Sequence, residues 1–228
     1  MTQHKQPLAL FSLFFVCGVL LTIGIGGCSR KVTHIEGSGQ RERETRELDD
    51  FDAIKVEGIG TIIIEFGKPA SCTVIAEDNL LEHYKTEVKD NVLTLAPTAS
   101  IRPTKKLRVA LSCESLNRIE LGGATEVQFK GVRGGDLKVV ANGTSKITAA
   151  GNVEHLELEA DGTCEFEMFK LKAATIDAVL HGASKANLHV TGSLTADIHG
   201  ASSICYDGNG SVNQTKEGVG SIRRRKRR

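Results

Sequence analysis

Two histidines and two carboxylates occupy one position of a repeating pattern, directly before a glycine. They are Asp161, His181, His199 and Glu217. If their segments stack as neighbouring strands, successive side chains lie about 5 Å apart. At that spacing they could bind a divalent metal or exchange protons. Asp and His also tolerate the backbone conformations that accompany a glycine turn. We favour the turn interpretation and expect neither a metal nor a cofactor, because a regular coil edge offers no cleft.

The cysteines offer a second kind of chemistry. The chain has six, and none belongs to a CxxC pair or to a zinc-type spacing. Cys72 and Cys113 both fall on the inward positions of alternating segments. The two can therefore pair as a disulfide in an oxidising compartment. We interpret Cys164 as a small buried residue and Cys205 as a free outward thiol.

A regular glycine spacing must position all of these residues. The glycines are separated by 20, 19, 20, 18 and 18 residues: Gly123, Gly143, Gly162, Gly182, Gly200 and Gly218. A small residue follows two positions after each: Thr125, Ser145, Cys164, Ser184, Ser202 and Gly220. An apolar residue follows four positions after each: Val127, Ile147, Phe166, Ala186, Ile204 and Ile222. A constant repeat length, with the same residue types at the inward positions of each repeat, is typical of a solenoid. In a solenoid each coil buries its apolar edge against its neighbours.

The pattern predicts a single all-β domain over residues 51–222. We expect a parallel β-helix-like solenoid with coils of about 18–20 residues, right-handed because parallel crossovers prefer that hand. Residues 51–115 are strand-rich but less regular and form its N-terminal part. Outward columns such as Glu126, Lys146, Glu165 and Lys185 alternate in charge. We interpret them as solvated cross-strand pairs rather than catalytic groups.

The N-terminus predicts export and lipidation. Lys5 precedes an uncharged apolar run from Leu8 to Gly27, and Cys28 follows directly. This arrangement resembles a bacterial lipoprotein signal, which implies cleavage after residues 1–27 and lipidation of Cys28. An uncleaved membrane anchor is the alternative, since the run is long enough to span a bilayer. We expect the polar residues 28–50 to form a flexible tether. Ser29 resembles the residue choice that permits transfer to the outer membrane.

The charge balance argues against a nucleic-acid partner. The chain has 29 basic and 28 acidic residues. Without Lys5 and the six basic residues of the tail 223–228, the body has 22 basic and 28 acidic residues. An exported, acidic body with few aromatic residues is a poor nucleic-acid binder. We interpret the tail as a solvated terminus, with contact to lipid phosphate as the alternative. The sequence contains no G-x-S-x-G, no phosphate-binding glycine loop and no H-E-x-x-H.

Several segments together resemble one family. They are Phe51–Gly58, Ala76–Leu81, Thr86–Val88, His181–Ser184 and His199–Ser202. In combination they are similar to the putative auto-transporter adhesin head, or GIN, domain family, over roughly residues 50–222. The resemblance implies a parallel β-helix-like domain, often on lipoproteins of Bacteroidetes-type bacteria, with no established enzyme activity. It transfers no functional residues.

These observations lead to one functional hypothesis and two alternatives. We expect a non-enzymatic protein of the bacterial outer membrane, attached through its lipid and facing either the periplasm or the cell surface. Its β-solenoid surface would bind a polysaccharide or a protein, as an adhesin does. The alternatives are a polysaccharide-acting β-helix enzyme and a periplasmic assembly scaffold. Fold alone does not choose among them.

Overall fold

A computed structural model describes residues 33–226 of the chain. Thr33–Arg228 is a compact unit in itself, and its described part is all-β except for one short helix, α1 (Asp78–Leu81). Within that part, no helix is long and apolar enough to cross a membrane. The expected signal, residues 1–27, and the expected lipidation site, Cys28, lie outside the described residues.

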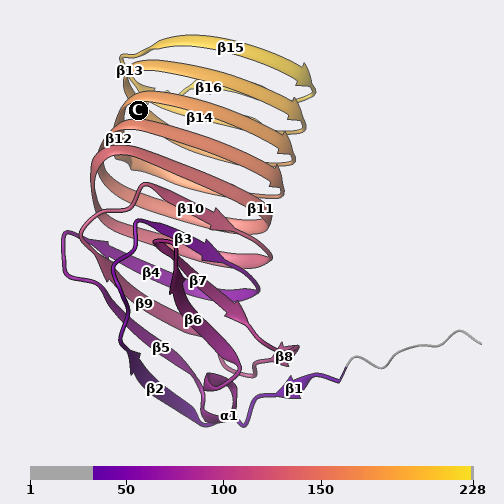
Figure 1. Cartoon of the computed structure of the whole chain (residues 1–228). Coiled ribbons are helices and arrows are strands. Elements are labelled where there is room, and N and C mark those ends of the chain that lie inside the picture. The colour runs from indigo at the N-terminus through magenta and orange to yellow at the C-terminus, as the bar shows by residue number, and fades with distance from the viewer. Residues whose placement is uncertain (1–32, 227–228) are drawn as a thin grey trace, which may run out of the picture. The chain divides into compact units, whose positions relative to one another are not determined.

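The C-terminal two thirds of the body is a stack of parallel strands (Figure 1). Its strands are β10 (Arg118–Leu121), β11 (Ala124–Gly162), β12 (Glu165–Gly182), β13 (Lys185–Gly200), β14 (Ser203–Gly208), β15 (Ser211–Gly218) and β16 (Ser221–Arg224). Gly162 pairs with Gly182, and Gly200 pairs with Gly218. Phe166 lies between Ile147 and Ala186. The predicted columns are therefore confirmed at these positions.

The N-terminal third makes the sheet mixed. Two strands continue the parallel pairing: β3 (Ala53–Val56) beside β10, and β4 (Ile59–Phe66) beside β11. The antiparallel partners are β2 (Arg41–Arg46) with β5 (Ser71–Glu77), β5 with β9 (Arg108–Cys113), and β6 (Tyr84–Lys89) with β7 (Val92–Pro97). The expected less regular, β-rich N-terminal part is therefore present, and a parallel solenoid is not confirmed over the whole of residues 51–222. The tight turn at Asp90 and Asn91, both with positive φ, explains one antiparallel pair, because such a turn reverses the chain directly.

Part of the segment 28–50, expected to be a flexible tether, belongs to the sheet. Residues 41–46 form β2, and Ile35–Glu36 forms β1 beside β8 (Ile101–Arg102). The Arg46 guanidinium donates to the Leu81 carbonyl at 2.7 Å. A charged strand can pair along a sheet edge without burying its side chains, because the edge offers unpaired backbone groups. The charged composition of residues 41–46 excludes a buried core strand, but it does not exclude a strand at the edge of the sheet.

The basic tail is attached as far as it is described. Arg223 and Arg224 belong to β16. The Arg224 guanidinium donates to the Gly208 carbonyl, and Arg225 lies over the Phe169 ring at 4.4 Å from its centroid. This contact is a cation–π interaction. Residues 223–225 are exposed, as expected for a solvated terminus, but they are held against the body rather than frayed.

Each corner of the stack requires glycine. Gly162 has φ of +127°, and a Cβ there would lie 2.3 Å from the Gly143 carbonyl oxygen of the neighbouring coil. A side chain would meet both an unfavourable φ and a backbone group. Neighbouring coils therefore pack closely at the glycine corners. The apolar residue four positions after each glycine then lies in the core. Phe166, the largest fully buried side chain, is 0% exposed.

Candidate functional site

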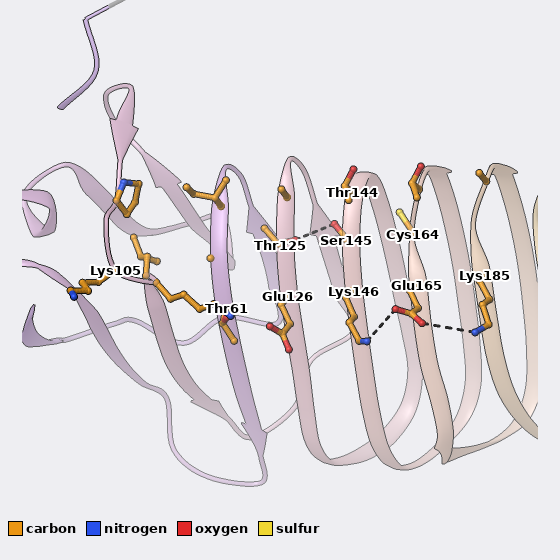
Figure 2. A pocket seen from close by; sticks show the side chains of 18 of the residues that line it. Thr61, Lys105, Thr125, Glu126, Thr144, Ser145, Lys146, Cys164, Glu165 and Lys185 are labelled. Atoms are coloured by element: carbon orange, nitrogen blue, oxygen red, sulfur yellow. Dashed lines mark hydrogen bonds and ion pairs between the residues drawn. The ribbon is translucent and has the colours of Figure 1, made fainter. Parts of the chain in front are cut away.

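One concave surface follows the corners of the stack rather than a single strand. It is a groove with a volume of about 780 Å³, shown in Figure 2. It crosses the coils from β4 to the start of β13, and the segment 103–107 lies at its N-terminal end. Its floor holds the residues two positions after the glycines: Thr125, Ser145 and Cys164. One wall holds the residues just after the glycines: Ala124, Thr144, Thr163 and Ala183.

The polar groups of the floor are already bonded within the protein. The Thr125 and Ser145 hydroxyls share a hydrogen bond of 3.1 Å, and both residues are buried. The Cys164 thiol points to the Ala141 carbonyl at 3.5 Å. Burial raises the pKa of this thiol, and hydrogen bonds from Ser145 and Ser184 oppose that rise. The floor therefore presents methyl and methylene groups and a protonated thiol, with no group activated as a nucleophile.

The second wall carries the predicted charge ladder. The Glu165 carboxylate lies 3.1 Å from the Lys146 ammonium and 4.0 Å from the Lys185 ammonium (Figure 2). The hydrogen bond to Glu165 raises the pKa of Lys146, and the same bond lowers the pKa of Glu165. These side chains are partly exposed, so the pairs contribute little to stability. They neutralise one another across the middle of the groove.

The N-terminal end of the groove is fixed by a buried carboxylate. Glu77 is 0% exposed, and its oxygens accept from the Thr104 amide at 2.9 Å, the Thr104 hydroxyl at 2.5 Å and the Gly39 amide at 2.8 Å. Burial acts to raise the pKa of Glu77, but these hydrogen bonds and one from the Lys105 amide outweigh it, so the pKa is lowered. Glu77 thereby holds segment 103–105 in place beside the groove.

The predicted histidine column lies on the other side of the glycines from the groove residues. The His181 and His199 rings stack with centroids 4.6 Å apart and an interplanar angle of 15°. His199 also contacts Glu217 and Asp197, each at 3.2 Å, while Asp161 pairs with His181 through the strand register. The structure thus brings the predicted residues together. Across residues 33–226, however, no group of three or more His, Cys, Asp or Glu side chains has a geometry that could hold a metal.

The two cysteines predicted to pair are buried free thiols in the structure. Cys72 lies opposite Leu111 in the antiparallel register, so it is diagonal to Cys113 rather than opposite it. Diagonal neighbours are about 7–8 Å apart, beyond the Cβ separation of about 3.8 Å that a disulfide needs. Burial raises the pKa of each thiol to about 11. The disulfide stays a prediction, and this register does not favour it.

The comparison with known families identifies the fold. The sequence profile described as "Putative auto-transporter adhesin, head GIN domain" matches residues 50–210. The chain belongs to the GIN domain family. This match confirms the resemblance that the sequence motifs indicated. No curated protein matches the chain significantly.

Solved structures from other bacteria have a similar fold. A "putative adhesin" from Bacteroides fragilis NCTC 9343 superimposes with a TM-score of 0.67 at 22% identity, covering 83% of this chain and 99% of its own. A "putative lipid binding protein" from Parabacteroides distasonis ATCC 8503 gives 0.57 at 18% identity, covering 85% and 100%. A "putative adhesin" from the same strain gives 0.56 at 22% identity, covering 84% and 100%. At these identities the similarity establishes the fold. The first of these solved chains is matched over almost its whole length.

The groove was not predicted from the sequence, because a regular coil edge without long inserted loops was not expected to form a cleft. The segment 103–107, which precedes the repeat, forms one end, and the uniformly small residues after each glycine leave the remaining space. The signal was the column of small residues, which sequence reasoning treated only as inward packing.

Proposed function

We propose that this GIN domain protein is a non-enzymatic binding protein of the bacterial cell envelope, adhesin-like and anchored by lipid at Cys28. The observation that carries the binding role is the groove along the glycine corners, which is large and lacks a catalytic arrangement. The family and the solved relatives are described by adhesion and binding rather than by turnover. We interpret the parallel stack as a right-handed β-helix-like solenoid whose N-terminal end is covered by antiparallel strands.

The groove chemistry supports binding over catalysis. Its lining contains no histidine, aspartate or arginine. Lys146 and Lys185 share Glu165, and Cys164 is a buried thiol with a raised pKa. General acid–base catalysis needs a group that can gain and lose a proton near neutral pH beside the substrate. The carboxyl groups that such an enzyme could use in this groove are Glu126 and Glu165, and Glu165 is paired with both lysines.

The anchoring proposal is tested at Cys28. The parent chain should carry lipid mass on an N-terminal Cys28 after signal cleavage. A Cys28→Ala variant should keep its signal and lose that modification. Release of signal-cleaved, unlipidated parent chain into the soluble fraction would contradict the anchor. The expected destination is the outer membrane, which density separation of the membranes measures.

The adhesin-like role is tested by exposure. An antibody against residues 51–222 should label intact cells as well as permeabilised cells. A periplasmic marker must label only the permeabilised cells, which controls for leakage. Labelling of the protein only after permeabilisation would contradict adhesion and favour the periplasmic scaffold.

A further inference from the structure

The groove has an apolar path with cations at one end. The apolar path includes the Ile59 side chain and the methyl groups of the wall formed by Ala124, Thr144, Thr163 and Ala183. It also includes the floor, where the polar groups of Thr125, Ser145 and Cys164 are bonded within the protein. Ile59 is 43% exposed and is one of two exposed large hydrophobic residues among residues 33–226. The other, Val219, does not line the groove. Ile59 therefore adds exposed apolar surface to the lining of the groove.

The charges differ along the groove. Lys105 and Lys106 lie at its N-terminal end, and both are exposed. Neither ammonium group forms an ion pair with a carboxylate in the described part of the chain, whereas the lysines in the middle of the groove share Glu165. Glu126 adds a negative charge near the middle of the lining, and its carboxylate accepts from the Gln128 amide at 3.4 Å. An anionic group is therefore favoured at the Lys105–Lys106 end and disfavoured further along.

The length of the groove suits one hydrocarbon chain. Its floor crosses the strands that carry Gly60, Thr125, Ser145, Cys164 and Lys185, and four strand spacings amount to about 19 Å. Half of a bilayer's hydrocarbon core, the depth of one acyl chain, is about 15 Å. For a sugar polymer, the floor offers few free hydrogen-bonding groups and the lining has no aromatic ring, so the Thr144 and Thr163 hydroxyls on the wall would have to bind it. An acyl chain needs neither.

The cationic end of the groove also lies where the described chain begins. β1 pairs with β8, the Gly37 amide donates to the Arg102 carbonyl at 3.1 Å, and segment 103–107 follows directly.

We propose that the groove binds one acyl chain of an anionic membrane phospholipid, with the phosphate at Lys105 and Lys106 and the chain along the glycine corners. This inference deepens the proposed binding role and rests on it. Burial of each methylene group is favourable, so the apolar path supplies affinity. The two ammonium groups select the headgroup and fix the direction of the lipid.

The test uses the chain from Thr33 to Arg228, which is compact in itself and matches solved relatives of the same extent. The protein is incubated with dioleoyl phosphatidylglycerol or dioleoyl phosphatidylcholine in detergent micelles. Native mass spectrometry then counts the lipids that each chain retains. We expect a single phosphatidylglycerol per chain and about tenfold weaker retention of phosphatidylcholine, which corresponds to about 1.4 kcal/mol.

Two variants with matched controls locate the lipid. Ala124→Phe fills the groove and should abolish retention, whereas Ala201→Phe places the same side chain at an exposed equivalent position beyond the lining and should not change it. Lys105→Gln/Lys106→Gln should remove the preference for phosphatidylglycerol. Lys170→Gln/Lys172→Gln removes two exposed lysines outside the groove and should preserve it. Circular dichroism confirms that each variant is folded, and the lysine variants provide the test if Ala124→Phe is not.

Several results would overturn the proposal. They are no retained lipid, equal retention by Ala124→Phe and the parent chain, or equal retention of the two phospholipids. Stronger retention of oleic acid than of phosphatidylglycerol would overturn the choice of a membrane lipid. The surface-labelling result is independent of these measurements. Failure of lipid retention and failure of the adhesin-like role are therefore distinguishable.

Discussion

Replacing one corner glycine by alanine tests whether close stacking of the corners holds the body together. We choose Gly162→Ala, because its Cβ would lie 2.3 Å from the Gly143 carbonyl oxygen. The matched control is Gly134→Ala. Gly134 has a similar φ, +146° against +127°, but a Cβ there would have no atom within 4 Å. Both variants lose glycine's freedom at positive φ, and only one meets the neighbouring coil.

The expected magnitudes follow from these two geometries. A non-glycine residue at positive φ costs about 1–2 kcal/mol, and this cost applies to both variants. An ordinary carbon contact is about 3.5 Å or longer, so the alanine at 162 must displace a backbone carbonyl by more than 1 Å. That carbonyl accepts from the Thr163 amide at 2.8 Å. Weakening this bond and separating two packed coils adds about 2–3 kcal/mol. We therefore expect losses of about 4 kcal/mol for Gly162→Ala and about 1–2 kcal/mol for Gly134→Ala.

The assay is guanidinium unfolding of the chain from Thr33 to Arg228, followed by far-ultraviolet circular dichroism. A shift of the midpoint at constant slope reports the change in the free energy of unfolding. Equal losses for the two variants, within about 0.5 kcal/mol, would refute the reasoning, because backbone conformation alone would then explain both. If Gly162→Ala fails to fold while Gly134→Ala folds, the difference is larger than estimated and has the expected direction.

Three further predictions concern buried groups. The pKa of Glu77 is lowered on folding, so its contribution to stability is present above about pH 4.3 and is lost as the pH falls through the folded pKa. Glu77→Gln should cost about 1–3 kcal/mol and flatten the fall in unfolding free energy below pH 4.3; an unchanged acid profile would contradict this. Cys72 and Cys113 have pKa values raised to about 11, so iodoacetamide at pH 8 should label them only after unfolding, and resistance of both in the unreduced, unfolded chain would indicate the disulfide. Phe166→Ala should cost about 3–5 kcal/mol in the same unfolding assay, and a loss below about 1 kcal/mol would contradict its place in the core.

Many residues of the candidate site were predicted from the sequence, but the groove that they line was not. The column containing Thr125, Ser145 and Cys164 was predicted, as was the alternating charge of Lys146 and Glu165. The pairing of Lys146 with Glu165 at 3.1 Å agrees with that prediction. The groove needed a second wall and an end, and the end comes from segment 103–107, outside the repeat. No spacing rule places a non-repeating segment beside a repeating one.

The sequence by itself determined the all-β class, the corner glycines and the columns that stack. Its period fixes which residues meet, because each coil contacts only its neighbours. The tertiary structure alone decided where the repeat ends and how the rest of the body covers that end. Residues 41–46 join the sheet because β5 has an open edge there, and Glu77 holds Thr104 because the fold places buried amide groups around one carboxylate. Such contacts join residues that are distant in the chain and have no period, so only the folded backbone brings them together.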